Sequence, residues 1–314
     1  MVIQPGLRAL WIITALPCTI ADSAGSVMKR VAENSVSITD DRTHVRVQRL
    51  GLLECYPWWN KDHRWDPFWR LYLNDGPGAS LVHEGEESPL DPTLIALVPA
   101  WCSFATRITR PGVSHFYVHF DVLNLSRPLT EAWFPHPIVI RDPGVHAAAV
   151  TAREAFRAQK GAALLCSAKA AIYAGLGKAV DVLAMNVQAR WADLVEGGSP
   201  VARALRFIED HLSESITVDE MAGRSGLGRD QFTRLFRGAF NQSPHHYLMD
   251  RRLAACAQLL AFGEERLDTI AERCGFTDRG HLSRLFVRRF GISPSAYRKG
   301  REREALSNAA APVA

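Results

Sequence analysis

Five arginines lie in one stretch of the chain, GFTDRGHLSRLFVRRFGISPSAYR (275–298), where Asp278 is the only acidic residue. A guanidinium group donates paired hydrogen bonds to guanine or phosphate, and serine and histidine side chains reach base edges and phosphates. Apolar residues recur in the same stretch at helical spacing, namely Leu282, Leu285, Phe286 and Phe290. The pattern predicts a helix that packs through this face and presents on its other face Arg279, Gly280, His281, Ser283, Arg284, Arg288 and Arg289.

The positive charge of the chain is concentrated around this stretch. Residues 201–303 contain 18 Lys and Arg against 13 Asp and Glu, a net charge of +5, whereas the 314-residue chain as a whole has a net charge of +4. Such a localised basic excess is the electrostatic footprint of a nucleic-acid partner. The overall composition, 47% hydrophobic and 22% charged, is typical of a soluble globular protein and argues against disorder or a membrane fold.

The basic third of the chain contains the same unit twice. The first halves of the two units align directly, and the second halves align after a shift of one residue near Thr277. The aligned residues are Asp219, Ala222, Arg224, Gly226, Arg234, Leu235, Phe236, Phe240, Ser243, Pro244 and Tyr247 in the first unit, and Asp268, Ala271, Arg273, Gly275, Arg284, Leu285, Phe286, Phe290, Ser293, Pro294 and Tyr297 in the second.

Each unit has the pattern of a helix, a tight turn and a second helix. In the first unit, Thr217 and Glu220 form a capping-box pattern, and Gly226 permits a turn that a residue with a Cβ would resist. A second helix is predicted over about residues 229–239, with an apolar face and a polar face. The polar face carries Arg229, Asp230, Thr233, Arg234 and Arg237. This is the arrangement of a helix-turn-helix, whose second helix enters the major groove of DNA.

A longer helix that begins at Ser243 and Pro244 is predicted to connect the two units. A rigid connector would hold the two second helices about 34 Å apart, one turn of DNA, so that one chain reads two successive major grooves. The alternative is a pair of structural helical hairpins with solvated arginines. The repeat keeps both the turn glycine and the basic face, which favours DNA binding.

The stretch 275–298 resembles the second helix-turn-helix of the AraC/XylS family of bacterial transcription regulators, and AGRSGLGRDQFTRLFRGAFNQSPHHYL (222–248) resembles the first. The resemblance covers about residues 200–301 and is carried by the GF, R-x-F and G-x-SP-x-x-YR elements at their spacings. Asn241 stands where the second unit has Gly291. This is a small departure, because asparagine also tolerates a left-handed conformation.

The resemblance implies which residues contact DNA. It places Asp230, Thr233 and Arg234 of the first unit, with Arg279, Gly280, His281, Ser283 and Arg284 of the second, where the family contacts DNA. Arg234 and Arg284 have a second interpretation, in which they brace the fold or hold phosphate. Arg229 and Arg288, which lie on the same polar faces, complete the predicted DNA-binding set.

The region before the basic third divides into a strand-rich part and a helix-rich part. Short alternating runs between His44 and Asp121, separated by NDGPG (74–78) and RPG (110–112), indicate a sandwich or small barrel. After residue 142, an alanine-rich sequence predicts two or three helices that end at Glu196, followed by a hinge at GGSP (197–200). The apolar residues of these helices could pair with a second subunit or pack on the barrel; they are Leu164, Leu165, Ile172, Tyr173, Val180 and Leu183.

The family resemblance also implies a multidomain organisation. We expect a cupin-like β-barrel that binds an effector at 40–142 and a helical dimerisation or linker region at 143–196. An all-α tandem helix-turn-helix domain at 199–303 and a disordered tail at 304–314 would follow.

Polar and aromatic residues of the strand-rich part are candidates for effector binding. In FWRLYLN, Arg70, Tyr72 and Asn74 share one strand face, where they would be costly inside a barrel unless water or a ligand satisfies them. The alternative places this face outside the barrel. Trp58, Trp59 and Trp65 would add flat apolar walls suited to a sugar or an aromatic ring. The predicted effector-binding set is Trp58, Arg70, Tyr72, Asn74, His83 and His115.

Sequence patterns for metal binding and catalysis are weak. His115, Tyr117 and His119 share a strand face, but the metal-cupin spacing with a following glutamate is absent, and we predict no metal. There is no glycine-rich phosphate loop and no GxSxG, so no catalytic residue and no cofactor is predicted. Two alternatives stay open. One is a metal-dependent cupin enzyme with a helical appendage, and the other is a constitutive DNA-binding protein with a structural barrel.

Two further observations concern the compartment. The six cysteines show no CxxC pattern, which fits free thiols in a reducing cytosol. Arg8 followed by ALWIITALPCTIA (9–21) is similar to a secretory signal, whereas a start at Met28 would make residues 1–27 an upstream extension. We predict a cytoplasmic, ligand-responsive transcription regulator and no enzyme. Its predicted partners are double-stranded DNA, a small-molecule effector, a second copy in a homodimer and RNA polymerase, with no membrane.

Overall fold

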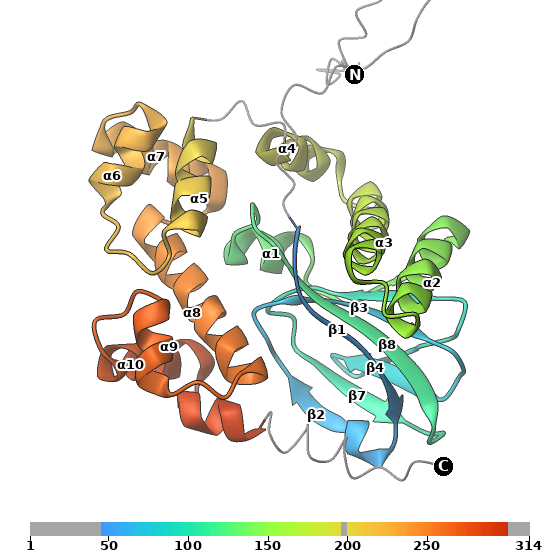
Figure 1. Ribbon diagram of the computed structural model, residues 1–314. Helices are drawn as coiled ribbons and strands as arrows, with labels where there is room; N and C mark the ends of the chain where they lie inside the picture. Colours follow the sequence, from blue (N-terminus) through green and yellow to red (C-terminus); the bar gives the residue numbers. More distant parts are fainter. Residues whose placement is uncertain (1–44, 196–199, 301–314) are drawn as a thin grey trace, which may run out of the picture.

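The structure, a computed structural model, describes residues 45–195 and 200–300. A β-barrel lies between a group of helices on one side and a helical C-terminal region on the other (Figure 1). The signal-like segment, Met28, the first three residues of the GGSP segment and the tail at 304–314 lie outside the described residues. The described part confirms the predicted fold class, a cupin-like barrel with helices followed by an all-α region.

Two antiparallel sheets form the barrel. The larger sheet has the order β1-β8-β3-β6-β9 and the smaller has the order β2-β7-β4-β5. The strands are β1 (Val45–Cys55), β2 (Lys61–Arg64), β3 (Trp69–Asn74), β4 (Ala79–His83), β5 (Glu86–Pro89), β6 (Ile95–Val98), β7 (Phe104–Ile108), β8 (Val113–Val122) and β9 (Ile138–Ile140). A short 3-10 helix, η1 (Pro57–Trp59), follows β1, and α1 (Arg127–Trp133) follows β8.

Both faces of the central strand β3 are buried. Trp69, Leu71 and Leu73 belong to the main hydrophobic core, while Arg70 and Tyr72 line a cavity inside the barrel. Successive strand residues point to opposite faces, so the alternation in FWRLYLN does separate an apolar from a polar set. The alternative that the polar face lies outside the barrel is therefore wrong.

Two helices, α2 (Pro143–Arg157) and α3 (Gly161–Asp181), cover the outer side of the larger sheet. The next helix, α4 (Met185–Val195), packs beside α1 through contacts of Trp191 with Trp133 and Phe134. Asp142 caps α2 by accepting hydrogen bonds from the backbone of Gly144 and Val145. α3 is long and apolar enough to cross a membrane by length and composition. Its Ile172 is fully buried in the barrel core, however, whereas Leu165 and Tyr173 are exposed.

The C-terminal region consists of α5 (Val201–Asp210), α6 (Val218–Ser225), α7 (Arg229–Phe240), α8 (Pro244–Phe262), α9 (Leu267–Arg273) and α10 (Arg279–Phe290). The predicted capping box of Thr217 and Glu220 is confirmed at the start of α6. Gly226 at the end of α6 and Asn241 at the end of α7 both adopt the left-handed conformation, with φ of 68° and 54°. The predicted connecting helix is confirmed as α8, which begins at Pro244 with Ser243 as its cap.

The barrel and the C-terminal region share one hydrophobic core, which runs from the strands to α7 and α8. A buried ion cluster reinforces this contact. Arg251 of α8 lies 2.6 Å from Glu209 and 3.3 Å from Asp121 of the barrel, and Gln258 also donates to Asp121. A buried charge group of this kind is stable only when its members stay together.

Candidate nucleic-acid interface and ligand cavity

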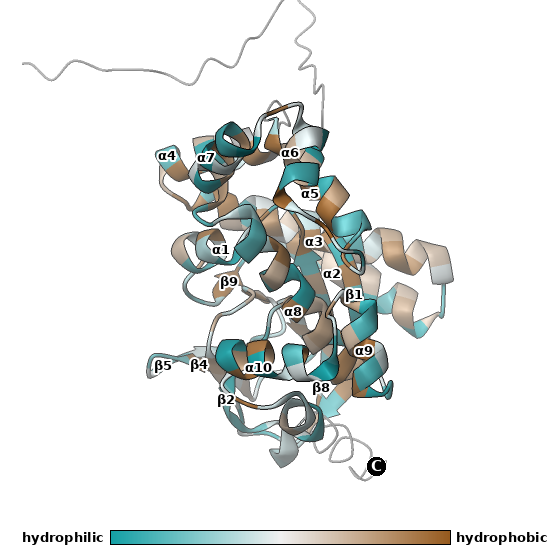
Figure 2. Cartoon of the chain, turned by 90° about the vertical axis from the view of Figure 1, so that its left-hand side faces the viewer, coloured by the Kyte–Doolittle hydropathy of each residue, from teal (hydrophilic) through white to brown (hydrophobic). Residues whose placement is uncertain are grey.

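Two helix-turn-helix units lie at the two ends of α8 (Figure 2). α6 and α7 form the first unit, and α9 and α10 form the second. The turn glycines Gly226 and Gly275 have φ of 68° and 75°, which a residue with a Cβ rarely adopts. Each turn therefore has the backbone that the sequence predicts for it.

The two units repeat the same aromatic packing. In the first, Phe236 contacts Phe240 at 4.7 Å and Tyr247 at 5.5 Å between ring centroids. In the second, Phe286 contacts Phe290 at 4.2 Å and Tyr297 at 5.5 Å. The aromatic residues that align in the sequence thus form equivalent cores, which explains why both units keep them at the same spacing.

The ion pairs beside the turns are equivalent as well. Arg229, the first residue of α7, lies 2.7 Å from Asp219 of α6. Arg279, the first residue of α10, lies 3.8 Å from Asp268 of α9. All four side chains are more than half exposed. Both arginines are therefore accessible at the surface despite their ion pairs.

The predicted DNA-binding residues lie on the polar faces of α7 and α10. Those that are exposed are Arg229, Asp230, Arg234, Arg279, Arg284 and Arg288, and those that are half-buried are Thr233, Gly280, His281 and Ser283. Arg289 was expected on the same face, and this expectation is wrong. Its side chain pairs with Asp250 of α8 and lies 5.6 Å from the Trp101 ring of the barrel. Burial and the nearby Arg127 lower the pKa of Arg289 to about 10.

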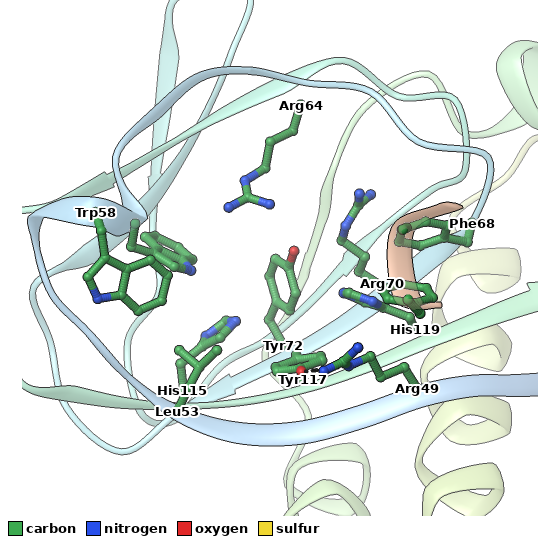
Figure 3. A pocket seen from close by; sticks show the side chains of 13 residues that line it. Arg49, Leu53, Trp58, Arg64, Phe68, Arg70, Tyr72, His115, Tyr117 and His119 are labelled. Atoms are coloured by element: carbon green, nitrogen blue, oxygen red, sulfur yellow. Dashed lines mark hydrogen bonds between the residues drawn. The ribbon is translucent and has the colours of Figure 1, made fainter. Parts of the chain in front are cut away.

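A cavity of about 120 Å³ lies inside the barrel. Strands β1, β3 and β8 form its floor, and residues 58–64 form the opposite wall (Figure 3). The register of β3 and β8 places Arg70 opposite His119, Tyr72 opposite Tyr117 and Asn74 opposite His115. Residues in these cross-strand pairs share a face, so the polar residues of the two strands gather on one side of the sheet.

Of the predicted effector-binding residues, four line this cavity: Trp58, Arg70, Tyr72 and His115. Asn74 is buried beside it and accepts a hydrogen bond of 2.7 Å from Nδ1 of His115. His83 lies elsewhere, with Nε2 at 2.9 Å from Nδ1 of His136, so its assignment to the same site is wrong. Trp65 also packs outside the cavity, at 5.2 Å from Trp101.

The cavity contains several residues that the sequence did not suggest: Arg49, Leu53, Arg64, Phe68, Ala261 and Phe262. Tyr117 and His119 were recognisable from their alternation with His115 in one strand. Arg49 and Arg64 carry no such signal, because exposed and buried arginines look alike in a short strand. Ala261 and Phe262 come from the end of α8, more than a hundred residues further along the chain.

Burial keeps both cavity histidines neutral. It lowers the pKa of His115 to about 3, with a further contribution from Arg64. Burial also lowers the pKa of His119 well below its usual value, and Arg70, Arg64 and Arg49 lower it further. The arginines thus give the cavity a positive electrostatic field.

Among the described residues, His83, Glu84 and His136 are the one group whose ligand atoms lie close enough together to hold a metal ion, all within 4.8 Å. This group lies on the β4–β5 turn and the loop after α1, apart from the cavity. His115 and His119, on which the cupin-enzyme alternative depends, are not part of it.

A family model described as a helix-turn-helix domain matches residues 221–300. The chain is 35% identical over 91 residues to the probable transcriptional regulator LumQ of Photobacterium leiognathi, a match that covers 29% of this chain and 37% of LumQ. It is 33% identical over 110 residues to the HTH-type transcriptional activator RhaS of Escherichia coli, covering 35% of this chain and 40% of RhaS. The matched segment therefore spans about two fifths of the length of these relatives.

Among solved structures, the chain is similar to a transcriptional regulator from Chromobacterium violaceum, described as containing an AraC-type DNA-binding domain. The identity is 28%, the TM-score is 0.31, and the match covers 32% of this chain and 91% of that chain. The C-terminal region is an AraC-type helix-turn-helix domain.

The AraC-type domain is attached to the barrel through equivalent residues of its two units. Tyr247 donates a hydrogen bond of 2.8 Å to the carbonyl of Leu123, and Tyr297 donates one of 2.6 Å to the carboxylate of Asp66. Asp66 also accepts a hydrogen bond from Arg70 in the cavity. One carboxylate therefore connects the barrel cavity with the second unit of the AraC-type domain.

Proposed function

We propose that the protein is a sequence-specific DNA-binding transcription regulator whose promoter activity is controlled by a small molecule bound in the barrel. The observation that carries this proposal is the double contact of Asp66, with Arg70 in the cavity and with Tyr297 in the AraC-type domain. The names of LumQ and RhaS support a regulator rather than an enzyme.

DNA recognition is assigned to the exposed faces of α7 and α10. α8 has 19 residues, which corresponds to a length of about 28 Å at 1.5 Å per residue. This length suits two recognition helices that enter successive major grooves. We propose that Arg279, Gly280, His281, Ser283, Arg284 and Arg288 read one groove, and that Arg229, Asp230, Thr233 and Arg234 read the next.

Control by an effector is supported by the position of α8. Its last residues, Ala261 and Phe262, line the barrel cavity together with strand residues. The Phe262 ring lies 5.6 Å from Phe68 and 5.7 Å from His119. A ligand in the cavity would contact both parts of the protein, and differential contact of this kind is what couples two sites.

The remaining partners are part of the same proposal. The exposed Leu165 and Tyr173 of α3 offer an apolar surface for a homodimer. The relatives are regulators by name, so we propose a cytoplasmic location without a membrane partner, with RNA polymerase as a further contact at the promoter. The same proposal includes the division of the chain into an effector-binding barrel at 40–142, a helical dimerisation or linker region at 143–196 and a DNA-binding domain at 199–303.

The test of DNA binding uses the full chain and DNA sites selected from a random pool. Affinity measured by fluorescence anisotropy should fall steeply with salt, and Arg284→Gln should reduce the slope of log K against log salt by about 1 if it contacts phosphate. Arg279→Ala should relax the preference at one base position, at a cost of about 1–3 kcal/mol. Arg157→Ala on α2, far from both recognition helices, is the matched control. Absence of binding at low salt would overturn the proposal.

The test of effector control compares the same affinity, and transcription from the selected promoter, with and without a cavity ligand. We expect a change in at least one of them. A ligand that binds the cavity and leaves DNA affinity, footprint and transcription unchanged would show that the barrel is a structural part of a constitutive DNA-binding protein.

A further inference from the structure

The side chains that line the barrel cavity offer hydrogen-bond donors and no carboxylates or carboxamides. The lining includes three arginines, Arg49, Arg64 and Arg70, together with two tryptophans, two tyrosines and two histidines. A neutral sugar is bound through hydroxyl groups that both donate and accept, so its site needs acceptors as well as donors. The composition of this cavity favours a ligand that is rich in acceptors.

Arg70 is the buried cation with unused hydrogen-bonding capacity. Its side chain is 1% exposed, and it donates to Asp66 through Nη2. Its Nε and Nη1 have no hydrogen-bond partner among the described residues. A desolvated guanidinium is costly unless its remaining protons are satisfied, so each of these unpaired nitrogens marks a place for an acceptor.

The surroundings leave Arg70 short of negative charge. Its only ion-pair partner in the described part of the chain is Asp66, and that carboxylate also accepts the hydroxyl proton of Tyr297. Arg49 is directed to the hydroxyl of Tyr117 at 3.3 Å rather than to a carboxylate. The depressed pKa values of His115 and His119 have the same origin, burial beside arginines.

The cavity also limits the size and shape of the ligand. Its volume of about 120 Å³ is close to the roughly 150 Å³ of an apolar cavity that binds benzene. Aromatic rings stand at both ends, with Phe68 beside Arg70 and Trp58 across the cavity (Figure 3). A small apolar body therefore fits between the rings while a charged end reaches Arg70.

We propose that the cavity binds a small organic anion with an apolar body, whose acidic group accepts a hydrogen bond from Nη1 of Arg70, on the edge of the guanidinium that Nη1 shares with Nη2. This inference rests on the proposed effector control and specifies its ligand. The anion competes with Asp66 for Arg70 and so weakens the contact of Asp66 with Tyr297. Phe262 of α8 closes the cavity over the apolar body, because its ring already contacts Phe68 and His119.

The experiment measures binding to the full chain by calorimetry and by the shift in melting temperature. The organic anions tested are phenylacetate, hexanoate and phenyl phosphate. Phenylacetamide and hexanamide are the neutral counterparts of the two carboxylates. Inorganic phosphate tests a charge without an apolar body, and glucose tests a neutral sugar. We expect at least one of the organic anions to bind at least tenfold more tightly than its neutral counterpart, than inorganic phosphate and than glucose. Comparing the affinity of phenyl phosphate with those of the two carboxylates shows whether the cavity prefers a phosphate ester or a carboxylate.

Two variants link this binding to Arg70. Asp66→Asn removes the competing carboxylate, so the anion should bind at least threefold more tightly. Arg70→Met should abolish binding of the anion, and the double variant Asp66→Asn with Arg70→Met repeats this test without leaving a buried charge alone. Arg107→Met, on the outside of the barrel, is the control and should bind normally.

The outcomes separate this inference from the proposed function. Equal binding of the neutral amides, preferential binding of glucose, binding of inorganic phosphate alone, or no binding of any organic anion would overturn the anion inference. None of these results would affect DNA binding by the AraC-type domain. Failure of DNA binding at low salt, with anion binding intact, would instead overturn the proposed function.

Discussion

The hydroxyl of Tyr297 and the carboxylate of Asp66 lie 2.6 Å apart, although 231 residues separate them in the chain. Tyr297 lies in the helical residues 294–300 that follow α10, and Asp66 precedes the central strand of the barrel. The equivalent tyrosine of the first unit, Tyr247, donates to the neutral carbonyl of Leu123 instead. The second unit is thus attached through a charged group that also holds Arg70, and the first is not.

This difference predicts unequal effects of two matched substitutions. Tyr297→Phe should lower the free energy of unfolding by about 1.5–3 kcal/mol, because it removes a hydrogen bond to a charged acceptor. Tyr247→Phe should lower it by about 0.5–1.5 kcal/mol, as expected for a neutral acceptor. Urea titrations followed by circular dichroism measure both values. A larger loss for Tyr247→Phe would contradict the special role of Asp66.

The two turn glycines should differ in their tolerance of alanine. Both have positive φ, but a Cβ on Gly226 would meet only the end of Arg203 at 3.9 Å, whereas a Cβ on Gly275 would lie 2.4 Å from the backbone oxygen of Leu212. Gly226→Ala should therefore cost about 1–2 kcal/mol of stability from backbone strain alone. Gly275→Ala should cost more than this, since backbone must move.

Gly291→Ala provides the control for this comparison, because Gly291 has φ of 74° and nothing within 4 Å of its added Cβ. Its melting temperature should resemble that of Gly226→Ala. Equal melting temperatures for Gly275→Ala and Gly291→Ala would show that Leu212 is not packed against the second turn as the structure describes.

The buried ion cluster should be sensitive to loss of its cation. Arg251→Met leaves Glu209 and Asp121 buried, with 7% and 4% of their side chains exposed, and should cost about 3–5 kcal/mol of stability. Arg229→Met breaks an exposed pair with Asp219 and should cost only about 0–1 kcal/mol. Thermal unfolding of the two variants measures both losses of stability. Similar losses in the two variants would contradict the prediction.

The cavity histidines should make the barrel sensitive to acid. The folded protein holds the pKa of His115 at about 3 and that of His119 well below 6.5, chiefly through burial. Between these values and about pH 6.5 the unfolded chain binds protons that the folded chain does not, so stability falls as pH falls, by up to about 1.4 kcal/mol per pH unit for each histidine.

Urea titrations at a series of pH values from about 7 to 5 measure this slope. His119→Gln should make it shallower, because one of the two groups is removed. His245→Gln, at an exposed position of α8, should leave it unchanged. An unchanged slope in His119→Gln would mean that His119 is accessible to protons in the folded protein.

The helix-turn-helix units could be recognised from the sequence because the signals are local. The Thr217 and Glu220 capping box, the turn glycines and the aromatic residues at three and four spacing each act within a few turns of helix. Repetition then reinforced the turn glycines and the aromatic residues, whereas the second unit begins at Arg266 without a capping box. The orientation of Arg289 was the exception, since its contact with Trp101 depends on how the domain packs against the barrel.

The barrel cavity could be predicted only in part. Strand alternation correctly grouped Arg70 with Tyr72 and placed Asn74 beside them, because side chains of a strand alternate between two faces whatever lies around them. Alternation does not say which face is enclosed, and it gives no information on the partner strand. His83 was therefore grouped with a site from which it is distant.

By itself, then, the sequence determined the tandem units, the connecting helix and the strand faces, since these depend on contacts between residues close together in the chain. Only the tertiary structure decided that Arg70, Asp66 and Tyr297 meet, and that Phe262 of α8 enters the wall of the barrel cavity. Contacts between residues so far apart follow from the packing of whole elements, and no local pattern records that packing.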